Sequence, residues 1–167
     1  MKSKQSQINE IPMQPHKILL VDNEIQILNR LSHLLRASGW DVLTAIDGKD
    51  ALDKIKINRP DAIVLDMIMP EMDGFQVARS LKSHPDYRSI PIVAATSLWS
   101  QADRKRCLAA GCDDYVAKPF TLEQLRQRLQ IVLMPKSFPN RSAAENLNTV
   151  QTAGQETMRP AKKRRGS

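Results

Sequence analysis

The sequence is poor in cysteine, glycine and long apolar runs, and each shortage excludes a class of protein. Its two cysteines, Cys107 and Cys112, are too few for a disulfide framework, and their spacing is not that of a C-x-x-C zinc or redox motif. The six glycines form no glycine-rich phosphate loop, so the chain cannot use ATP itself. No apolar run approaches the roughly 18 residues of a membrane helix, and residues 1–15 lack the apolar core of a secretory signal. We therefore expect a cytoplasmic protein with reduced cysteines.

Positive charge is concentrated at one end of the chain. The net charge is +7, yet residues 16–134 hold 16 basic and 15 acidic side chains, whereas residues 135–167 hold seven basic and two acidic ones. This last segment is rich in Pro, Ser, Asn, Thr and Gln, so it cannot bury enough apolar surface to fold alone. We predict a disordered N-terminal extension over 1–15, one domain over 16–134 and a disordered basic tail over 135–167.

The central segment alternates short apolar runs with helical patterns. Runs rich in Val, Ile and Leu predict strands at 17–21, 40–45, 61–65, 90–95 and 114–117. Helical spacing predicts a helix carrying the stripe Ile27, Leu31, Leu34, Leu35 and Ser38, helices over 48–57, 75–84 and 101–110, and one from Leu122 to Val132. Strands that are apolar throughout and alternate with helices predict an α/β fold, a doubly wound five-stranded parallel sheet with five helices.

Polar residues of particular chemistry stand at the ends of four of these strands. Asp22 follows the first strand, Asp66 the third, Thr96 the fourth and Lys118 the fifth. One strand-end aspartate alone is most often a helix cap or turn residue, but the carboxyl ends of parallel strands meet at one edge, where ligands bind. We therefore expect the four residues to form one site. Oxygen ligands suit Mg²⁺, and an ionised aspartate beside a metal can attack phosphorus.

Four segments at this spacing resemble the receiver domains of bacterial two-component response regulators of the chemotaxis type. They are "ILLVDNE" (18–24), "DAIVLDMIMPEMDG" (61–74), "PIVAATS" (91–97) and "DYVAKPF" (114–120). The resemblance covers about residues 16–134 and implies the flavodoxin-like receiver fold. It also implies a phosphoryl group received from a partner histidine kinase or histidine phosphotransfer protein. The output would be a change in affinity for a downstream protein at the face of the fourth helix, fifth strand and fifth helix.

The resemblance implies a phosphoacceptor and an Mg²⁺ site. Asp66 would be the phosphoacceptor, and Asp22, Asn23, Asp66 and the backbone carbonyl of Ile68 would hold the metal. The family usually carries two acids after its first strand, whereas the second position here is Asn23, whose amide oxygen brings no charge. Glu24 is interpreted instead as an acid in the first turn of the following helix, favoured by the helix dipole.

The resemblance also implies roles for residues at the ends of the fourth and fifth strands. By resemblance, Thr96 and Lys118 bind the phosphoryl group, Tyr115 changes rotamer together with Thr96, and the Lys118–Pro119 bond is cis, as only proline commonly allows. A packed strand aromatic is the alternative interpretation of Tyr115. The chain is expected to be no enzyme toward other substrates, and to catalyse only its own Mg²⁺-dependent phosphorylation and dephosphorylation.

By resemblance, the side chains at two positions control dephosphorylation. They are Ile68, two residues beyond Asp66, and Leu98, two residues beyond Thr96. Neither side chain can hydrogen-bond to an attacking water, so a long-lived phosphorylated state is expected. A phosphoaspartate-type hydrolase would need a second acid at position 68, where this chain has isoleucine.

The leading hypothesis is thus a single-domain response regulator without a folded output domain. The alternative is a receiver whose basic tail, ending in "RPAKKRRGS" (159–167), binds nucleic acid through its phosphates, although such a run can equally be a solubilising tail.

Overall fold

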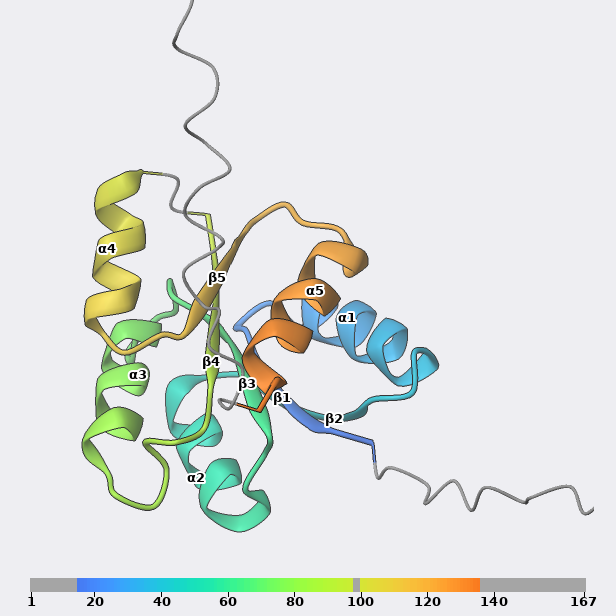
Figure 1. Ribbon diagram of the computed structural model, residues 1–167, viewed down its shortest axis with the longest axis horizontal. Helices are drawn as coiled ribbons and strands as arrows, with labels where there is room; N and C mark the ends of the chain where they lie inside the picture. The colour runs from blue at the N-terminus through green and yellow to red at the C-terminus, as the bar shows by residue number, and fades with distance from the viewer. Residues whose placement is uncertain (1–14, 98–99, 136–167) are drawn as a thin grey trace, which may run out of the picture. The chain divides into compact units, whose positions relative to one another are not determined.

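The computed structural model describes residues 15–97 and 100–135 (Figure 1). The predictions made for residues 1–14, for Leu98 and for 136–167 lie outside these residues. Five strands alternate with five helices: β1 (Lys17–Val21), α1 (Ile25–Ala37), β2 (Asp41–Ala45), α2 (Gly48–Asn58), β3 (Ala62–Asp66), α3 (Gly74–Ser83), β4 (Ile92–Thr96), α4 (Gln101–Ala109), β5 (Asp114–Ala117) and α5 (Leu122–Leu133). None of these helices is long and apolar enough to cross a membrane.

The strands form one sheet in the order β2-β1-β3-β4-β5, and every neighbouring pair is parallel. Helices α1 and α5 cover one face, and α2, α3 and α4 cover the other (Figure 1). This is the doubly wound α/β fold predicted from the sequence. All five strands end at the same edge, which brings the residues that end or follow them close together.

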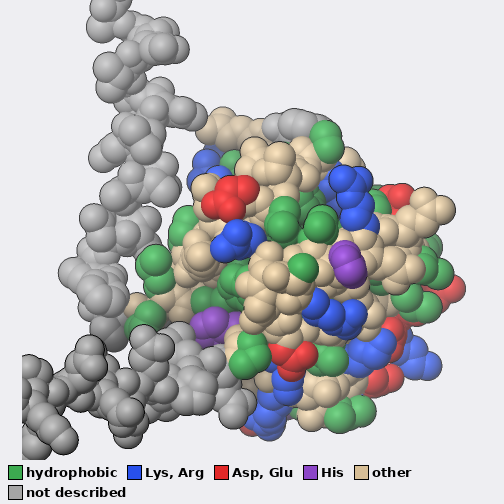
Figure 2. Space-filling model, turned by 90° about the vertical axis from the view of Figure 1, so that its right-hand side faces the viewer, with side chains coloured by type: hydrophobic (Ala, Val, Ile, Leu, Met, Phe, Trp, Pro, Cys, Tyr) green, Lys and Arg blue, Asp and Glu red, His purple; other side chains and the backbone are tan. Residues whose placement is uncertain are grey.

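Alternate strand residues pack into two apolar layers, one on each face of the sheet. Leu19 and Leu65 belong to the layer that includes α2 and α3, whereas Leu20 and Val64 belong to the layer that includes α1 and α5. On the side of α1, Figure 2 shows Lys and Arg interspersed with Asp and Glu. That mixture agrees with the nearly balanced charge of residues 16–134.

Two details differ from the sequence-based expectation. Strands β3 and β4 end one residue later than predicted, so Asp66 and Thr96 are the last residues of their strands and not the residues after them. The ladder continues because Met67 N–H donates to the carbonyl of Ala95 at 3.2 Å. On α1, the buried residues are Leu28, Ser32 and Leu35, so the prediction for Leu35 is confirmed. Ile27, Leu31 and Leu34 are only partly buried, and Ser38 is an exposed cap.

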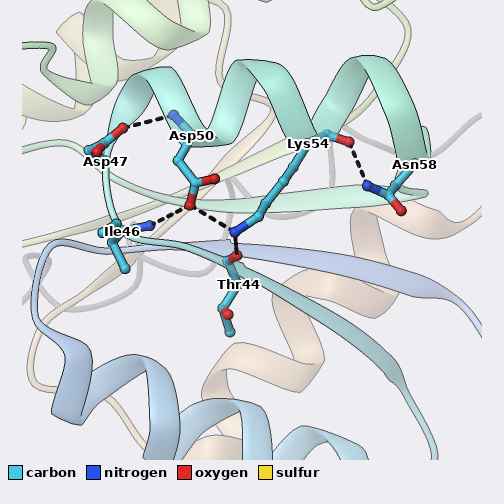
Figure 3. Close-up of polar contacts among 6 residues, drawn as sticks. All are labelled: Thr44, Ile46, Asp47, Asp50, Lys54 and Asn58. Atoms are coloured by element: carbon cyan, nitrogen blue, oxygen red, sulfur yellow. Dashed lines mark hydrogen bonds and ion pairs between the residues drawn. The ribbon is translucent and has the colours of Figure 1, made fainter.

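The connection from β2 into α2 is fixed by a chain of polar contacts (Figure 3). The Asp47 carboxylate caps α2 by accepting from Asp50 N–H at 2.7 Å. The Asp50 carboxylate accepts from Ile46 N–H at 3.2 Å and from Lys54 Nζ at 2.8 Å. Lys54 Nζ also donates to the carbonyl of Thr44 at 2.6 Å, which ties the end of the edge strand to the helix.

Candidate functional site

A lysine joins two buried carboxylates at the carboxyl edge of the sheet. Lys118 Nζ donates to Asp22 Oδ2 at 2.7 Å and to Asp66 Oδ2 at 3.1 Å. Asp22 directly follows β1, Asp66 ends β3, and Lys118 directly follows β5. The two aspartates are each only 5% exposed. The structure therefore brings three of the predicted site residues into direct contact, although Lys118 lies 96 residues from Asp22 in the sequence.

Backbone N–H groups that follow each aspartate orient its carboxylate through hydrogen bonds. Asp22 Oδ1 accepts from Glu24 N–H at 2.8 Å, and Asp66 Oδ1 accepts from Ile68 N–H at 3.0 Å. Each aspartate thus binds the N–H two residues ahead with one oxygen and the Lys118 ammonium with the other. A carboxylate oxygen carries two lone pairs, so these bonds leave each aspartate able to accept further contacts.

The protonation of the site is set by burial and by the ion pairs together. Burial raises the pKa of Asp66, and the Ile68 N–H and the charge of Lys118 offset part of that rise. For Lys118, burial alone lowers the pKa, but the hydrogen bonds and charges of Asp22 and Asp66 outweigh it, so the pKa is raised. The lysine therefore stays charged at neutral pH.

Thr96 joins this group from the next strand. It is 1% exposed and ends β4, where it lies one residue beyond Ala95, the register partner of Asp66. Its carbonyl accepts from Lys118 N–H at 2.8 Å, which fixes β5 and its lysine against β4. The Lys118–Pro119 peptide bond is cis.

The residues after β1 differ in their suitability for metal binding. Asp22 is buried, whereas Asn23 and Glu24 are exposed. Glu24 is the N-cap residue of α1 and its side chain makes no capping bond, so the prediction of a first-turn acid is wrong by one position. Nowhere in 15–97 or 100–135 do three His, Cys, Asp or Glu side chains gather into a metal-binding group. The Asp22 and Asp66 carboxylates still provide two oxygen donors with free lone pairs, which suits a hard cation that keeps several waters.

Close packing behind Asp66 requires a glycine at position 74, the last residue of the segment "DAIVLDMIMPEMDG". A Cβ on Gly74 would collide with the carbonyl oxygen of Asp66 and lie 2.7 Å from Met67 Cα. Gly74 N–H donates to the Met67 carbonyl at 3.2 Å, and the Asp73–Gln76 capping box starts α3 at this point. Helix α3 thus begins directly against the backbone that carries Asp66.

Tyr115 lies on β5, two residues before the end of the strand. Its side chain is half-buried and packs against the apolar layer of α2, α3 and α4, and the guanidinium carbon of Arg104 lies 5.1 Å from its ring centroid. The ring is therefore both a packing residue and a partly exposed one. Ile68, beside Asp66, is 50% exposed.

Comparisons with known proteins identify the family of this domain. The family model of the response regulator receiver domain matches residues 18–130. The response regulator MprA of Mycolicibacterium vanbaalenii is 41% identical over 132 residues, which cover 79% of this chain and 56% of that protein. The chain thus spans about half the length of this relative.

Two solved structures extend the similarity to the fold. The chemotaxis protein CheY4 of Vibrio cholerae is 36% identical with a TM-score of 0.68, over 71% of this chain and 98% of that one. The receiver domain of the sensor histidine kinase PA1611 from Pseudomonas aeruginosa, which has a magnesium ion coordinated in its active site cleft, is 34% identical with a TM-score of 0.66. This match covers 71% of this chain and 98% of the PA1611 receiver domain.

The sheet order, the two aspartates joined by a lysine at its carboxyl edge, and the match over residues 18–130 lead to one conclusion. The chain belongs to the response regulator receiver domain family of two-component signal transduction.

Proposed function

We propose that this receiver accepts a phosphoryl group on Asp66 from a phosphohistidine of a partner kinase or phosphotransfer protein, and that phosphorylation changes its affinity for a downstream protein. The observation that carries the proposal is the ammonium of Lys118 held between Asp22 and Asp66, at 2.7 and 3.1 Å. This arrangement places an ionisable nucleophile beside a fixed positive charge in a buried site, where electrostatic stabilisation is strong.

In the proposed step, an Asp66 oxygen attacks phosphorus. The oxygen–phosphorus bond forms as the bond to the donor's histidine nitrogen breaks, and that nitrogen keeps the electron pair. The Ile68 N–H orients Asp66 through Oδ1. Lys118 and the hydroxyl of Thr96 then bind oxygens of the transferred group. Positioning and charge neutralisation account for most of the catalysis in such a transfer.

We propose that Asp22, Asp66, Asn23 and the Ile68 carbonyl hold Mg²⁺ during this transfer. When bound, the metal neutralises charge on the phosphoryl oxygens. Asp22 and Asp66 bring two negative charges to the pocket, whereas Asn23 brings none. Because affinity for hard cations rises with the charge of the ligands, this pocket is expected to bind Mg²⁺ weakly for its family.

We further propose that the receiver acts stoichiometrically in the cytoplasm and not as an enzyme on other substrates. The phosphoryl group rests on the protein's own side chain, and only hydrolysis or transfer removes it. Output is proposed to occur at the face formed by α4, β5 and α5, which contains Tyr115 and adjoins Lys118. Phosphorylation needs to bias this face by only a few kcal/mol to switch it.

Intact mass after incubation with acetyl phosphate and Mg²⁺ tests the proposal. Wild type should gain the mass of one phosphoryl group, and Asp66→Asn should gain none. Asp53→Asn is the matched control, because Asp53 is an exposed aspartate on α2 that pairs with Lys56 at 3.2 Å. Phosphorylation of Asp66→Asn, or an equal loss in both variants, would contradict the assignment.

A further inference from the structure

Helix α4 is attached to the sheet with little apolar burial. Of its residues Gln101–Ala109, only Cys107 is buried. Its N-terminus is fixed locally by the Ser100–Asp103 capping box. A surface helix usually packs through a stripe of several apolar residues, so α4 depends on other contacts to hold its position.

Two arginines of α4 supply such contacts by lying over aromatic rings. The guanidinium carbon of Arg104 is 5.1 Å from the ring centroid of Tyr115 on β5. That of Arg106 is 4.6 Å from the ring centroid of Phe75 on α3. Both distances are within the range of cation–π attraction. The two contacts are alike in chemistry, but only one involves the aromatic residue on the strand that leads to Lys118.

We propose that Arg104 is a positioning residue for Tyr115: its guanidinium stabilises the tyrosine rotamer seen here and thereby opposes the rotamer change that accompanies phosphorylation of Asp66. The inference rests on the proposed function and on the change of rotamer that the family resemblance implies for Tyr115. Tyr115 is the register partner of Ala94, two residues before Thr96 on β4, so it lies on the strand next to the phosphoryl-binding threonine. Arg104 is eight residues beyond Thr96, on the helix that follows β4.

The expected effect follows from two-state thermodynamics. A contact made in only one of two states shifts their populations by its own free energy. Loss of the Arg104–Tyr115 contact should therefore ease switching by about two- to five-fold, which corresponds to about 0.5–1 kcal/mol. The activated state should then form at lower concentrations of a phosphoryl mimic.

The composition of the chain makes a direct measurement possible. The sequence holds two tyrosines, Tyr87 and Tyr115, so 3-fluorotyrosine labelling of the full chain gives one ¹⁹F signal from each. Tyr87 is an internal control, because its ring centroid lies 5.7 Å from the guanidinium carbon of Arg59 and its ring stacks on His84, so its ring contacts differ from those of Tyr115. Beryllofluoride with excess Mg²⁺ is the probe, and the Tyr115 signal is followed through the titration.

Three variants decide the matter. In Arg104→Gln, the resting Tyr115 signal should move toward the position that wild type reaches with saturating beryllofluoride. The beryllofluoride concentration at the midpoint of the titration should fall by about two- to five-fold. Arg104→Lys, which keeps a cation without the planar guanidinium, should fall between Arg104→Gln and wild type. Arg106→Gln, which loses the equivalent contact with Phe75, should leave both readouts unchanged. The Tyr87 signal should stay constant in all three and so report an intact fold.

Two results would overturn the inference. One is a Tyr115 signal and midpoint in Arg104→Gln equal to those of wild type. Another is an equal change in Arg106→Gln, because that would indicate a general loosening of α4. Failure of the proposed function is distinguishable: the wild-type Tyr115 signal would then ignore beryllofluoride, while the resting signal of Arg104→Gln would still show whether Arg104 sets the rotamer.

Discussion

Replacing Lys118 with methionine tests the electrostatic account of the site. Methionine approximates the length of the lysine side chain and removes its charge. In the wild type, the Lys118 side chain is 18% exposed and joins two aspartates whose side chains are each 7% exposed. The variant leaves both carboxylates buried without their shared cation, so Lys118→Met should lower the free energy of unfolding.

The size of the loss follows from the distances. Two unit charges about 3 Å apart attract by roughly 5 kcal/mol at an effective dielectric constant of about 20. Breaking a buried ion pair by removing one partner typically costs about 3–5 kcal/mol, because the other charge stays buried. We expect a loss in this range at neutral pH. Lys54→Met is the matched control. Like Lys118, Lys54 makes two polar contacts, here with a carboxylate and a carbonyl, but its side chain is 38% exposed. Its replacement should therefore lower the free energy of unfolding by only about 1 kcal/mol.

The loss should also depend on pH, with a defined sign. Burial already raises the pKa of Asp66, and removing Lys118 removes groups that lower it, so the pKa in the variant rises further. A raised pKa in the folded state means that the ionised carboxylate destabilises the fold as the pH rises through that pKa. The difference between Lys118→Met and wild type should therefore be smaller at about pH 5 than at about pH 7.

Urea unfolding at both pH values, without added metal, measures these differences. A loss below about 1 kcal/mol at neutral pH would refute the reasoning, because it would mean that the carboxylates do not need the lysine. A loss that does not change with pH would show that missing packing, and not charge, is responsible.

Further predictions concern the metal, the lifetime of the phosphorylated state and the fold. Asn23→Asp should tighten Mg²⁺ binding in a titration, since it adds a ligand charge. Ile68→Asn combined with Leu98→Glu should speed loss of the phosphoryl group by roughly one to two decades, because aligning the attacking water contributes about 1–3 kcal/mol. Asp66→Asn should raise the free energy of unfolding at neutral pH, and this gain should vanish as the pH falls below the ordinary pKa of aspartate.

Much of the fold follows from the sequence because the strands are distinctive. Buried parallel strands need apolar residues on both faces, and the predicted strands 17–21 and 61–65 meet this requirement. The rotation of α1 was less predictable. Ile27, Leu28, Leu31, Leu34 and Leu35 are all apolar and fit more than one stripe, so packing against the sheet decides that Leu28 and Leu35 are buried most deeply.

The site likewise has features that the sequence predicts and features that depend on packing. Asp22, Asp66 and Lys118 were predictable because parallel strands bring their carboxyl ends to one edge whatever the details of packing. The close approach of Gly74 to the backbone of Asp66 depends on where α3 begins in space. The contact of Arg104 with Tyr115 depends on how α4 lies on β5. No residue spacing in the sequence predicts either of these two contacts.

The central claim is that Asp66 receives the phosphoryl group, and chemical trapping tests it most directly. Borohydride reduces an aspartyl phosphate to homoserine, so peptide mapping after treatment with acetyl phosphate, Mg²⁺ and borohydride identifies the modified residue. The account predicts homoserine at position 66 and at no other aspartate. Homoserine at Asp22, or unmodified aspartate at position 66 in protein that has gained the phosphoryl mass, would contradict it.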